Sequence, residues 1–224
     1  DYGPCAFMDA FNPAQVFSSI DQMGRYAWNA QPSMASWNLA RLAEALLPLI
    51  DADEQAAVAA AQEVLAGFGA LFKAAHLAPF RAQLGPSLAE PGDAALIDGL
   101  LSRMATSRAD FTLTFRALAT GDASAHVRDP GAWESWAPDW QARLAREPDA
   151  PEGPTQRMLA ANPALIARNH QVEAMIEAAV AGDFAPFHRL SRALARPYAD
   201  QPDAQDLTRP PAPGEEVRQT FCGT

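Results

Sequence analysis

The chain is poor in several residue types, and each shortage narrows what the protein can be. It has two cysteines, Cys5 and Cys222, too few for a disulfide scaffold or a zinc site with four sulfur ligands. It has one lysine, Lys73, and its 27 acidic residues exceed its 17 basic ones, giving a net charge of −10. Since nucleic-acid binding needs a basic patch, we expect no nucleic-acid partner.

Long apolar runs are also scarce. Apolar residues make up 49% of the 224 residues, but the longest candidate span, residues 39–50, contains Arg41, Glu44 and Pro48. No basic segment followed by an apolar one opens the chain, as a signal peptide would. The sequence therefore predicts a soluble protein with no membrane partner. We also expect a monomer in the bacterial cytoplasm.

What the sequence does contain is helical periodicity, with almost no alternating strand pattern, so we expect a mainly α-helical fold. A first helix is expected from Ser33 to about Ile50. Its apolar residues fall near helical spacing and are predicted to be buried: Trp37, Leu39, Leu42, Ala43, Leu46 and Leu49. If Trp37 is buried, Trp37→Ala should cost roughly 3–5 kcal/mol.

Further helices follow this one. The second is predicted from about Asp53 to His76, with His76 capping its end, and residues 79–85 are predicted to be a link. Its predicted buried stripe is Val58, Leu65, Phe68, Leu71 and Phe72. A third helix is expected over about residues 94–106.

The next part of the chain carries aromatic residues at helical spacing. Asp110 is predicted to cap a helix that buries Phe111, Phe115 and Leu118. Trp133, Trp136 and Trp140 would share one helix face, as a stacking platform for a ligand or, more commonly, as core. Residues 147–154 are predicted to form a loop, and Asn162-Pro163 to begin a helix.

The stretch from Asp1 to Leu39 is the richest in residues with specific chemistry. It opens with Asp1-Tyr2-Gly3-Pro4, and an aspartate followed by an aromatic residue and a glycine is how kinase-like folds hold a metal ion. Such a tripeptide is also compatible with an ordinary turn. Asp21 and Arg25, four residues apart, could form an ion pair that pins the loop or could shape a phosphate-binding cleft.

Taken together, several pieces of this chain resemble the selenoprotein O family, also called YdiU, of kinase-like protein adenylyltransferases. The matching pieces, in order, are Asp1-Tyr2-Gly3-Pro4, Phe7-Met8-Asp9-Ala10-Phe11 with Pro13, Asp21 with Gly24-Arg25-Tyr26, Asn29 with Gln31-Pro32, and Trp37-Asn38-Leu39. Later matches are Asp110-Phe111-Thr112 with Thr114-Phe115-Arg116, and Met158, Asn162-Pro163 and Arg168-Asn169-His170.

The resemblance implies a helical C-terminal lobe of a kinase-like, or pseudokinase, fold. Residues 1–32 would hold the metal motif and an activation-loop-like region, residues 33–198 the helical lobe, and residues 199–224 an extended tail. It also implies ATP as substrate, Mg²⁺ or Mn²⁺ as cofactor, and transfer of AMP to Ser, Thr or Tyr hydroxyls of target proteins. Two other functions stay open: a helical interaction module without chemistry, and a lobe that transfers phosphate.

Only one residue of the reaction centre, Asp1, is expected within this chain, as the ligand of the metal and its nucleotide. By the resemblance, the catalytic base, the second metal ligand and the phosphate-binding residues would precede residue 1. With a motif at its first residue and no initiator Met, we expect the chain to be a piece of a longer protein that is inactive alone. Arg168 and His170 could face an anionic group, although bonds inside the lobe are the commoner use.

Cys222 is the third residue from the end, where members of the family carry selenocysteine or cysteine. The resemblance suggests a redox role, with a partner cysteine in the activation-loop region. This chain departs from that pattern, because Val16 or Phe17 stands near that place and the other thiol is Cys5. A Cys5–Cys222 disulfide, or two unpaired thiols, are both open.

Overall fold

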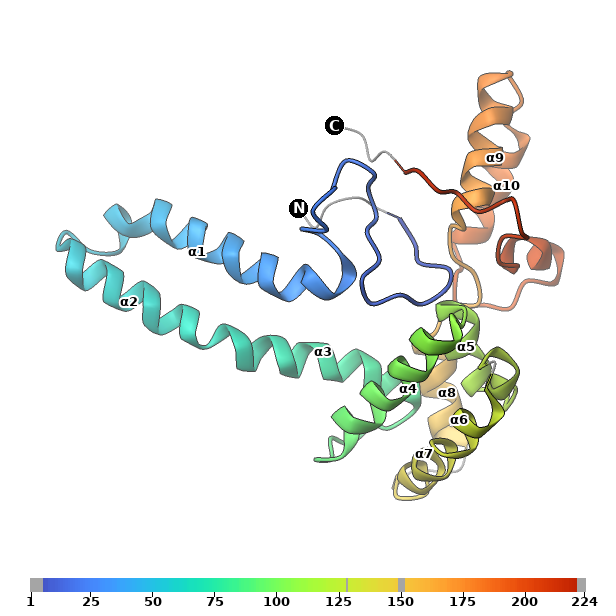
Figure 1. Cartoon of the computed structure of the whole chain (residues 1–224), viewed down its shortest axis with the longest axis horizontal. Coiled ribbons are helices and arrows are strands. Elements are labelled where there is room, and N and C mark those ends of the chain that lie inside the picture. Colours follow the sequence, from blue (N-terminus) through green and yellow to red (C-terminus); the bar gives the residue numbers. More distant parts are fainter. Residues whose placement is uncertain (1–5, 128, 149–151, 221–224) are drawn as a thin grey trace.

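The structure, a computed structural model, describes residues 6–127, 129–148 and 152–220. Over these ranges helices are joined by short irregular segments (Figure 1). The described residues form no β-strand, only one isolated bridge between Ala10 and Asp110. The mainly α-helical fold class is therefore confirmed.

The helices differ widely in length, from five residues in α6 to twenty in α1. The α-helices are α1 (Gln31–Ile50), α2 (Glu54–Ala66), α3 (Phe68–Leu84), α4 (Asp93–Ser107), α5 (Phe111–Leu118), α6 (Pro130–Glu134), α7 (Ala137–Leu144), α8 (Glu152–Ala161), α9 (Asn169–Val180) and α10 (Ala185–Leu194). The 3-10 helices are η1 (Trp28–Ala30), η2 (Ala123–His126) and η3 (Pro202–Thr208).

One large apolar core lies where α3, α4, α5, α7 and α8 meet. Its members are Phe11, Phe80, Leu84, Ile97, Leu100, Leu101, Met104, Ala109, Phe115, Ala117, Leu118, Ala123, Trp136, Ala137, Trp140 and Met158. A smaller core joins the segment before α9 to α10 and η3, through Leu165, Leu190, Ala193, Ala204 and Leu207. The molecule is thus held together at one end, around α4 and α5.

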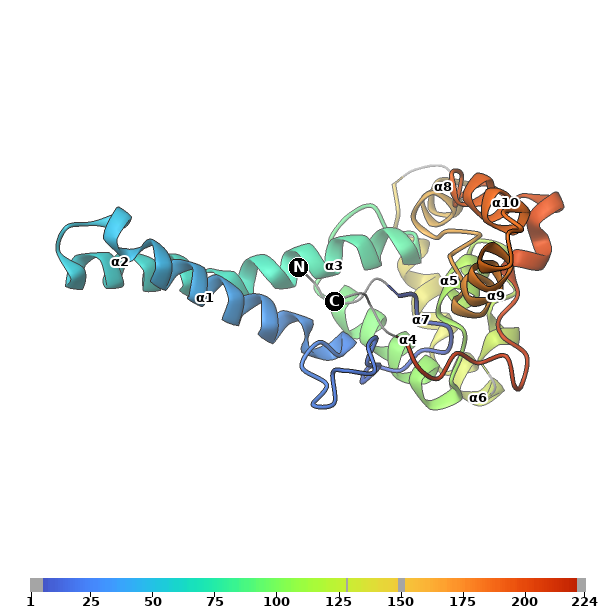
Figure 2. The same ribbon diagram turned by 90° about the horizontal axis from the view of Figure 1, so that it is seen from above.

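Away from these cores, α1 and α2 form a helical hairpin that projects from the body in both views (Figures 1 and 2). We call α1 and α2 the arm. The predicted burial of the first helix is wrong, because no residue of α1 is buried and Trp37 is 45% exposed. The helix also begins earlier than predicted, at Gln31, with no side-chain cap from Ser33.

The second predicted helix is in fact two helices, α2 and α3, separated at Gly67. The stripe of apolar residues predicted to be buried on it is only partly buried, since Leu71 is 71% exposed. The predicted link over residues 79–85 is wrong, because α3 continues through Pro79 to Leu84. A proline inside a helix costs stability without always ending it. The residue that ends α3 is Gly85, whose φ of +104° lies in the left-handed region that favours glycine.

His76 therefore lies within α3 rather than capping its end. Its ring stacks on Phe72 and packs against Phe80, at centroid distances of 5.7 and 4.9 Å.

One helical stretch, Glu54–Leu84, is long and apolar enough to cross a membrane by length and composition. The sequence alone did not identify this stretch, because the longest apolar candidate considered there was residues 39–50. The mean hydropathy of its most apolar window is 1.3, and only 6% of that window is buried. Core helices of soluble proteins meet the same criterion, so length and composition alone identify no membrane span.

The middle of the chain follows the prediction more closely. The third helix is α4, within one residue of the predicted bounds at each end, and Asp110 caps α5 by accepting a hydrogen bond from the Leu113 amide at 2.8 Å. The predicted helix start at Asn162-Pro163 is wrong. Asn162 follows α8, is fully buried, and donates from Nδ2 to the carbonyls of Gln83 and Phe115.

The three tryptophans do not share one helix. Trp133 lies on α6, Trp136 precedes α7, and Trp140 lies on α7. Trp136 and Trp140 stack at 5.5 Å between centroids, and their ring nitrogens donate to the carbonyls of Leu96 and Leu84. The core interpretation is confirmed for this pair, and the stacking platform is not available to a ligand. The predicted loop over residues 147–154 is shorter than expected, since α8 already begins at Glu152.

Candidate functional site

The site residues predicted from the sequence, Asp1, Cys5 and Cys222, lie outside the described residues. The first residue that the structure describes is Ala6, five residues after Asp1. The candidate site is therefore built from the segment that directly follows the metal motif, and from the residues that hold this segment in place.

Residues 7–11 are fixed to the start of α5 by backbone hydrogen bonds. The amide of Phe11 donates to the carbonyl of Ala109, and the amide of Phe111 donates to the carbonyl of Asp9, both at 2.8 Å. These two bonds make the β-bridge between Ala10 and Asp110. The side-chain amide of Asn169 adds a third bond, to the carbonyl of Phe7 at 3.1 Å.

Arg168, at the start of α9, is the central residue of this junction. It is 1% exposed, and its Nη1 donates to Asp9 Oδ1 and to Asp110 Oδ2, each at 2.6 Å. Its Nη2 donates to Asp110 Oδ1 at 3.2 Å and to the carbonyl of Thr208 at 3.1 Å. One guanidinium thus joins the segment after Asp1, the cap of α5 and the end of η3.

In this junction one positively charged guanidinium is shared by two negatively charged carboxylates, so negative charge is in excess when all three groups are ionised. Burial disfavours the charged form of Arg168, but hydrogen bonds and charge from Asp110 and Asp9 outweigh burial and raise the pKa of Arg168. The predicted interior role of Arg168 is therefore confirmed. An acid–base role for Asp110 is not supported, since both its carboxylate oxygens are used in binding Arg168 and Leu113.

His170 lies beside this junction. It is 8% exposed, its Nε2 lies 3.2 Å from the side-chain amide of Gln171, and its Nδ1 has no partner among the described residues. Burial, followed by the positive charge of Arg209, lowers the pKa of His170. At neutral pH the ring is neutral, which does not suit it to hold an anion.

The expected ion pair between Asp21 and Arg25 does not form. Both Asp21 oxygens accept backbone hydrogen bonds instead, from the amides of Arg25 and Tyr26 at 2.8 Å. The freed guanidinium of Arg25 lies over the ring of Trp37, 4.4 Å from its centroid. Asp21 is thus a turn cap, and Arg25 joins the loop to the base of the arm.

The C-terminal part of the described chain lies against this loop. The amide of Ser19 donates to the carbonyl of Thr220 at 2.9 Å, and the Thr220 hydroxyl donates to the carbonyl of Phe17 at 2.6 Å. Ala6 and Thr220 both line one cavity of about 250 Å³. The described residues nearest in sequence to Cys5 and Cys222 therefore line the same cavity.

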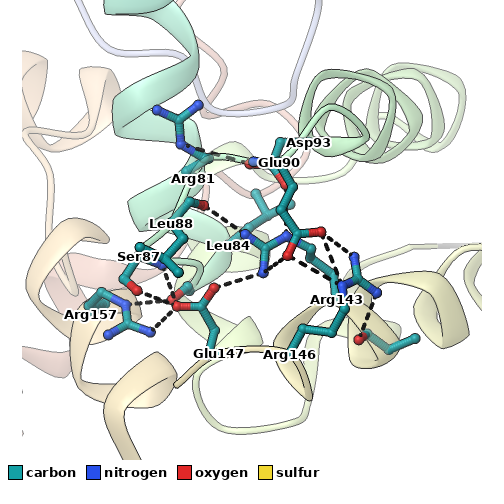
Figure 3. Close-up of polar contacts among 12 residues, drawn as sticks. Arg81, Leu84, Ser87, Leu88, Glu90, Asp93, Arg143, Arg146, Glu147 and Arg157 are labelled. Atoms are coloured by element: carbon teal, nitrogen blue, oxygen red, sulfur yellow. Dashed lines mark hydrogen bonds and ion pairs between the residues drawn. The ribbon is translucent and has the colours of Figure 1, made fainter. Parts of the chain in front are cut away.

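A second charged cluster was missed in the sequence. Arg143 on α7 is 3% exposed and binds Asp93 at 2.8 Å, Glu147 at 2.7 Å and the carbonyl of Leu88 at 2.7 Å (Figure 3). Burial disfavours the charged form of Arg143, but the hydrogen bonds that it donates to Asp93 and Glu147 outweigh burial and raise the pKa of Arg143. The only local signal was the spacing of Arg143 and Glu147, four residues apart.

This cluster fastens the segment between α3 and α4 to α7 and α8. Glu147 also accepts hydrogen bonds from Ser87 and Arg157, and Arg157 donates to the carbonyl of Gly85 (Figure 3). Since the carboxylates of Asp93 and Glu147 are engaged by protein groups, we assign the cluster a structural role.

No group of three or more His, Cys, Asp or Glu side chains that could hold a metal occurs in the described part of the chain. Within the candidate site, the carboxylates of Asp9 and Asp110 are both bound to Arg168. They are therefore not free to serve as ligands. The candidate ligand that the sequence offers is Asp1.

Comparisons with known proteins define the class. The chain is 52% identical over 232 aligned residues to a protein nucleotidyltransferase YdiU of Bradyrhizobium diazoefficiens, covering all of this chain and 47% of that protein. It is 51% identical over 224 residues to a protein nucleotidyltransferase YdiU of Ruegeria pomeroyi, covering all of this chain and 46% of that protein. Both relatives are, by name, protein nucleotidyltransferases.

The family match is more specific. Residues 1–195 match the family described as protein adenylyltransferase SelO. The chain belongs to the SelO family, and the resemblance read from its motifs is confirmed. It spans about half the length of the curated relatives it matches.

Proposed function

We propose that this chain is part of a protein adenylyltransferase, which moves AMP from ATP to a Ser, Thr or Tyr hydroxyl of a target protein. The observation that carries the proposal is the family match over residues 1–195, together with about 50% identity to nucleotidyltransferases along the whole chain. The described helices would form the C-terminal lobe of a kinase-like fold, with the divisions expected at residues 32 and 198.

The proposed reaction is a displacement at phosphorus. The target hydroxyl oxygen bonds to the α-phosphorus of ATP, the bond from that phosphorus to the oxygen bridging the β-phosphate breaks, and pyrophosphate leaves. The hydroxyl proton passes to a base that the family resemblance places outside this chain. A divalent cation, Mg²⁺ or Mn²⁺, would neutralise phosphate charge when bound.

Within this chain, Asp1 is the proposed metal ligand. The proposal is supported by the Asp-Tyr-Gly-Pro motif and by the anchoring of the segment that follows it. Asp9 is tied to the buried Arg168, and residues 9–11 are bonded to the start of α5. A segment held in this way can present a nearby carboxylate in a constant position, which cation binding requires.

Substitution of Asp1 tests this role. In a protein of the full family length that contains this chain (a family-length protein), Asp1→Ala should abolish AMP transfer and leave the melting temperature nearly unchanged, because the carboxylate is proposed to serve the metal rather than packing. AMP transfer is measured by the intact mass of the target protein. The control is Asp139→Ala on α7, outside the motif in sequence, which should retain activity. Unchanged turnover of Asp1→Ala at saturating Mg²⁺ would refute the role.

We also propose that Cys5 and Cys222 form a disulfide under oxidising conditions, which would tie the tail to the active-site end. The proposal is supported by the cavity that both Ala6 and Thr220 line. Closing so long a loop could stabilise the fold by about 5 kcal/mol on chain-entropy grounds. Non-reducing peptide mapping of the oxidised family-length protein should yield a Cys5–Cys222 peptide. Its absence would leave the thiols unpaired and the proposal wrong.

A further inference from the structure

The arm carries an apolar surface that the described structure leaves uncovered. On α1, Leu39, Leu42, Leu46, Leu49 and Ile50 are between 39% and 82% exposed. We call these five residues the leucine stripe. Their spacings of three, four, three and one residues place them on one face of the helix. Large apolar residues gathered on one face mark a binding surface rather than scattered surface residues.

The opposite side of α1 shows that the stripe is a distinct face. At 3.6 residues per turn, the charged residues Arg41 and Glu44 fall on the side of the helix away from the stripe, where they form an ion pair. The neighbour of α1 within the arm is α2, which buries Ala57 and Ala61 (Figure 2). Packing within the hairpin thus covers one side of α1 and leaves the leucine stripe exposed.

A groove at the base of the arm is a second feature with apolar lining. It has a volume of about 620 Å³ and lies between the start of α1 and helices α3 and α4. Its lining includes Trp28, Pro32, Phe72 and His76. The arm and its base therefore both present apolar side chains to whatever covers them.

We propose that the leucine stripe is an intramolecular docking face, covered by the part of the family polypeptide that this chain does not span. The chain aligns over its whole length, arm included, with relatives of which it makes up about half. A family-length protein therefore contains a further portion of similar size, enough to cover the arm. The proposal does not depend on the reaction that the protein catalyses.

Charge argues against a membrane as the occupant. Helices that lie on membranes carry Lys and Arg on their polar face, to meet anionic lipids. The polar face of α1 offers only Arg41, which is paired with Glu44. The turn at the tip of the arm is acidic, with Asp51, Asp53 and Glu54, and would be repelled by an anionic surface.

Length argues against a second copy of the chain. The stripe has the three-and-four spacing of a coiled-coil seam, but it extends only from Leu39 to Ile50, less than two heptads. Sustained coiled-coil pairing needs roughly three to four heptads. A broader protein surface from the same polypeptide fits the short stripe and the groove together.

Hydrogen–deuterium exchange tests the proposal without any substitution. Amide exchange in α1 is compared between this chain alone and a family-length protein that contains it. We expect exchange of residues 39–50 to be slower in the longer protein by about tenfold or more, the equivalent of ~1.4 kcal/mol of local stability. Equal exchange in the two proteins would overturn the proposal.

A pair of variants then locates the contact. Leu42→Glu with Leu46→Glu should leave the melting temperature of this chain unchanged, because both residues are exposed in it, but should abolish the protection of α1 in the longer protein. Glu44→Gln, on the opposite face, is the control and should preserve protection. Retained protection in the double variant would overturn the proposal.

The competing occupants give distinct results with this chain. Dimerisation by light scattering that Leu42→Glu with Leu46→Glu removes would mean that a second copy is the occupant. Co-flotation with phosphatidylcholine–phosphatidylglycerol vesicles that the same variant removes would mean a membrane. Either result contradicts the proposal, which expects a monomer that does not float with vesicles.

Discussion

At the scale of single residues, Arg168 is the side chain on which the junction after the metal motif depends. Replacing it by Met removes the cation and leaves Asp9 and Asp110 as unpaired carboxylates at a buried site. Breaking a buried pair in this way costs roughly 3–5 kcal/mol. We expect Arg168→Met to lower the free energy of unfolding by about that amount in urea denaturation.

A matched control is available on the surface. Arg189 binds Asp206 through both its Nη atoms, at 2.6 and 2.7 Å, but the two side chains are 43% and 62% exposed. Exposed pairs contribute about 0–1 kcal/mol, so Arg189→Met should have a much smaller effect. Equal losses in the two variants would show that burial of Arg168 is not what makes it important.

His170 gives the junction a dependence on pH. Four charged residues affect the pKa of His170. Arg209 and Arg168 lower it, and Asp9 and Glu215 raise it. Because the folded-state pKa lies below the ordinary value of 6.5, the unfolded chain binds the proton more readily. Stability from this residue is therefore complete above pH 6.5 and is lost as pH falls through the lowered pKa.

The measurement is the free energy of unfolding as a function of pH. Below pH 6.5, the slope should be smaller in His170→Gln than in the unaltered chain, because the substituted residue does not titrate. His188→Gln, on the exposed surface of α10, serves as control and should keep the slope. A slope that survives in His170→Gln would assign the pH dependence to other groups.

At the scale of elements, Gly85 decides where α3 stops. A Cβ at this position would lie 3.1 Å from Leu144 and 3.2 Å from Pro154, and φ is +104°. Gly121 also has a positive φ, +85°, but no atom within 4 Å of such a Cβ. Gly85→Ala should destabilise by more than the ~1 kcal/mol of the backbone effect alone, and Gly121→Ala by about that effect. Similar melting temperatures for the two variants would contradict this account.

Trp140 in the core and Trp37 on the arm differ in how deeply they are buried. Trp140 is 7% exposed and its ring nitrogen is bonded to Leu84, whereas Trp37 is 45% exposed. Trp140→Ala should cost roughly 3–5 kcal/mol in this chain. Trp37→Ala should cost far less, contrary to the value expected from the sequence. Comparable losses by urea denaturation would mean that the arm is packed more tightly than the structure indicates.

What could be predicted from the sequence was local. The cap at Asp110 and the bounds of α4 depend on residues a few positions apart, and both were predicted correctly. The stripe on α1 was recognised as apolar, but periodicity does not say whether anything covers it. Pro79 was misread as a break, although the helix tolerates it and ends at Gly85.

The candidate site was largely beyond such prediction. Arg168 pairs with Asp9, 159 residues away, and with Asp110, 58 residues away. No local pattern records a contact of that separation. The family motifs identified all three residues as part of matching pieces, but only the fold shows that they meet.

At the scale of the whole molecule, this chain is expected to be inactive by itself. By the family resemblance, the catalytic base and the phosphate-binding residues lie outside this chain, and the proposed reaction centre draws only Asp1 from it. Incubation with labelled ATP, Mg²⁺ and a general protein substrate should leave that substrate unlabelled, while a family-length protein labels it. Robust labelling by this chain alone would mean that the reaction centre lies within it.

The most direct test of the proposed function follows the two ends of ATP separately. A family-length protein containing this chain is incubated with Mg²⁺, a target protein, and ATP labelled at either the α- or the γ-phosphate. AMP transfer predicts that the α-label stays on the target and the γ-label leaves with pyrophosphate, and that Asp1→Ala removes the signal. A target that keeps the γ-label would be the product of a phosphate-transferring enzyme, and a target with neither label would indicate an interaction module. Either result would contradict the proposed function.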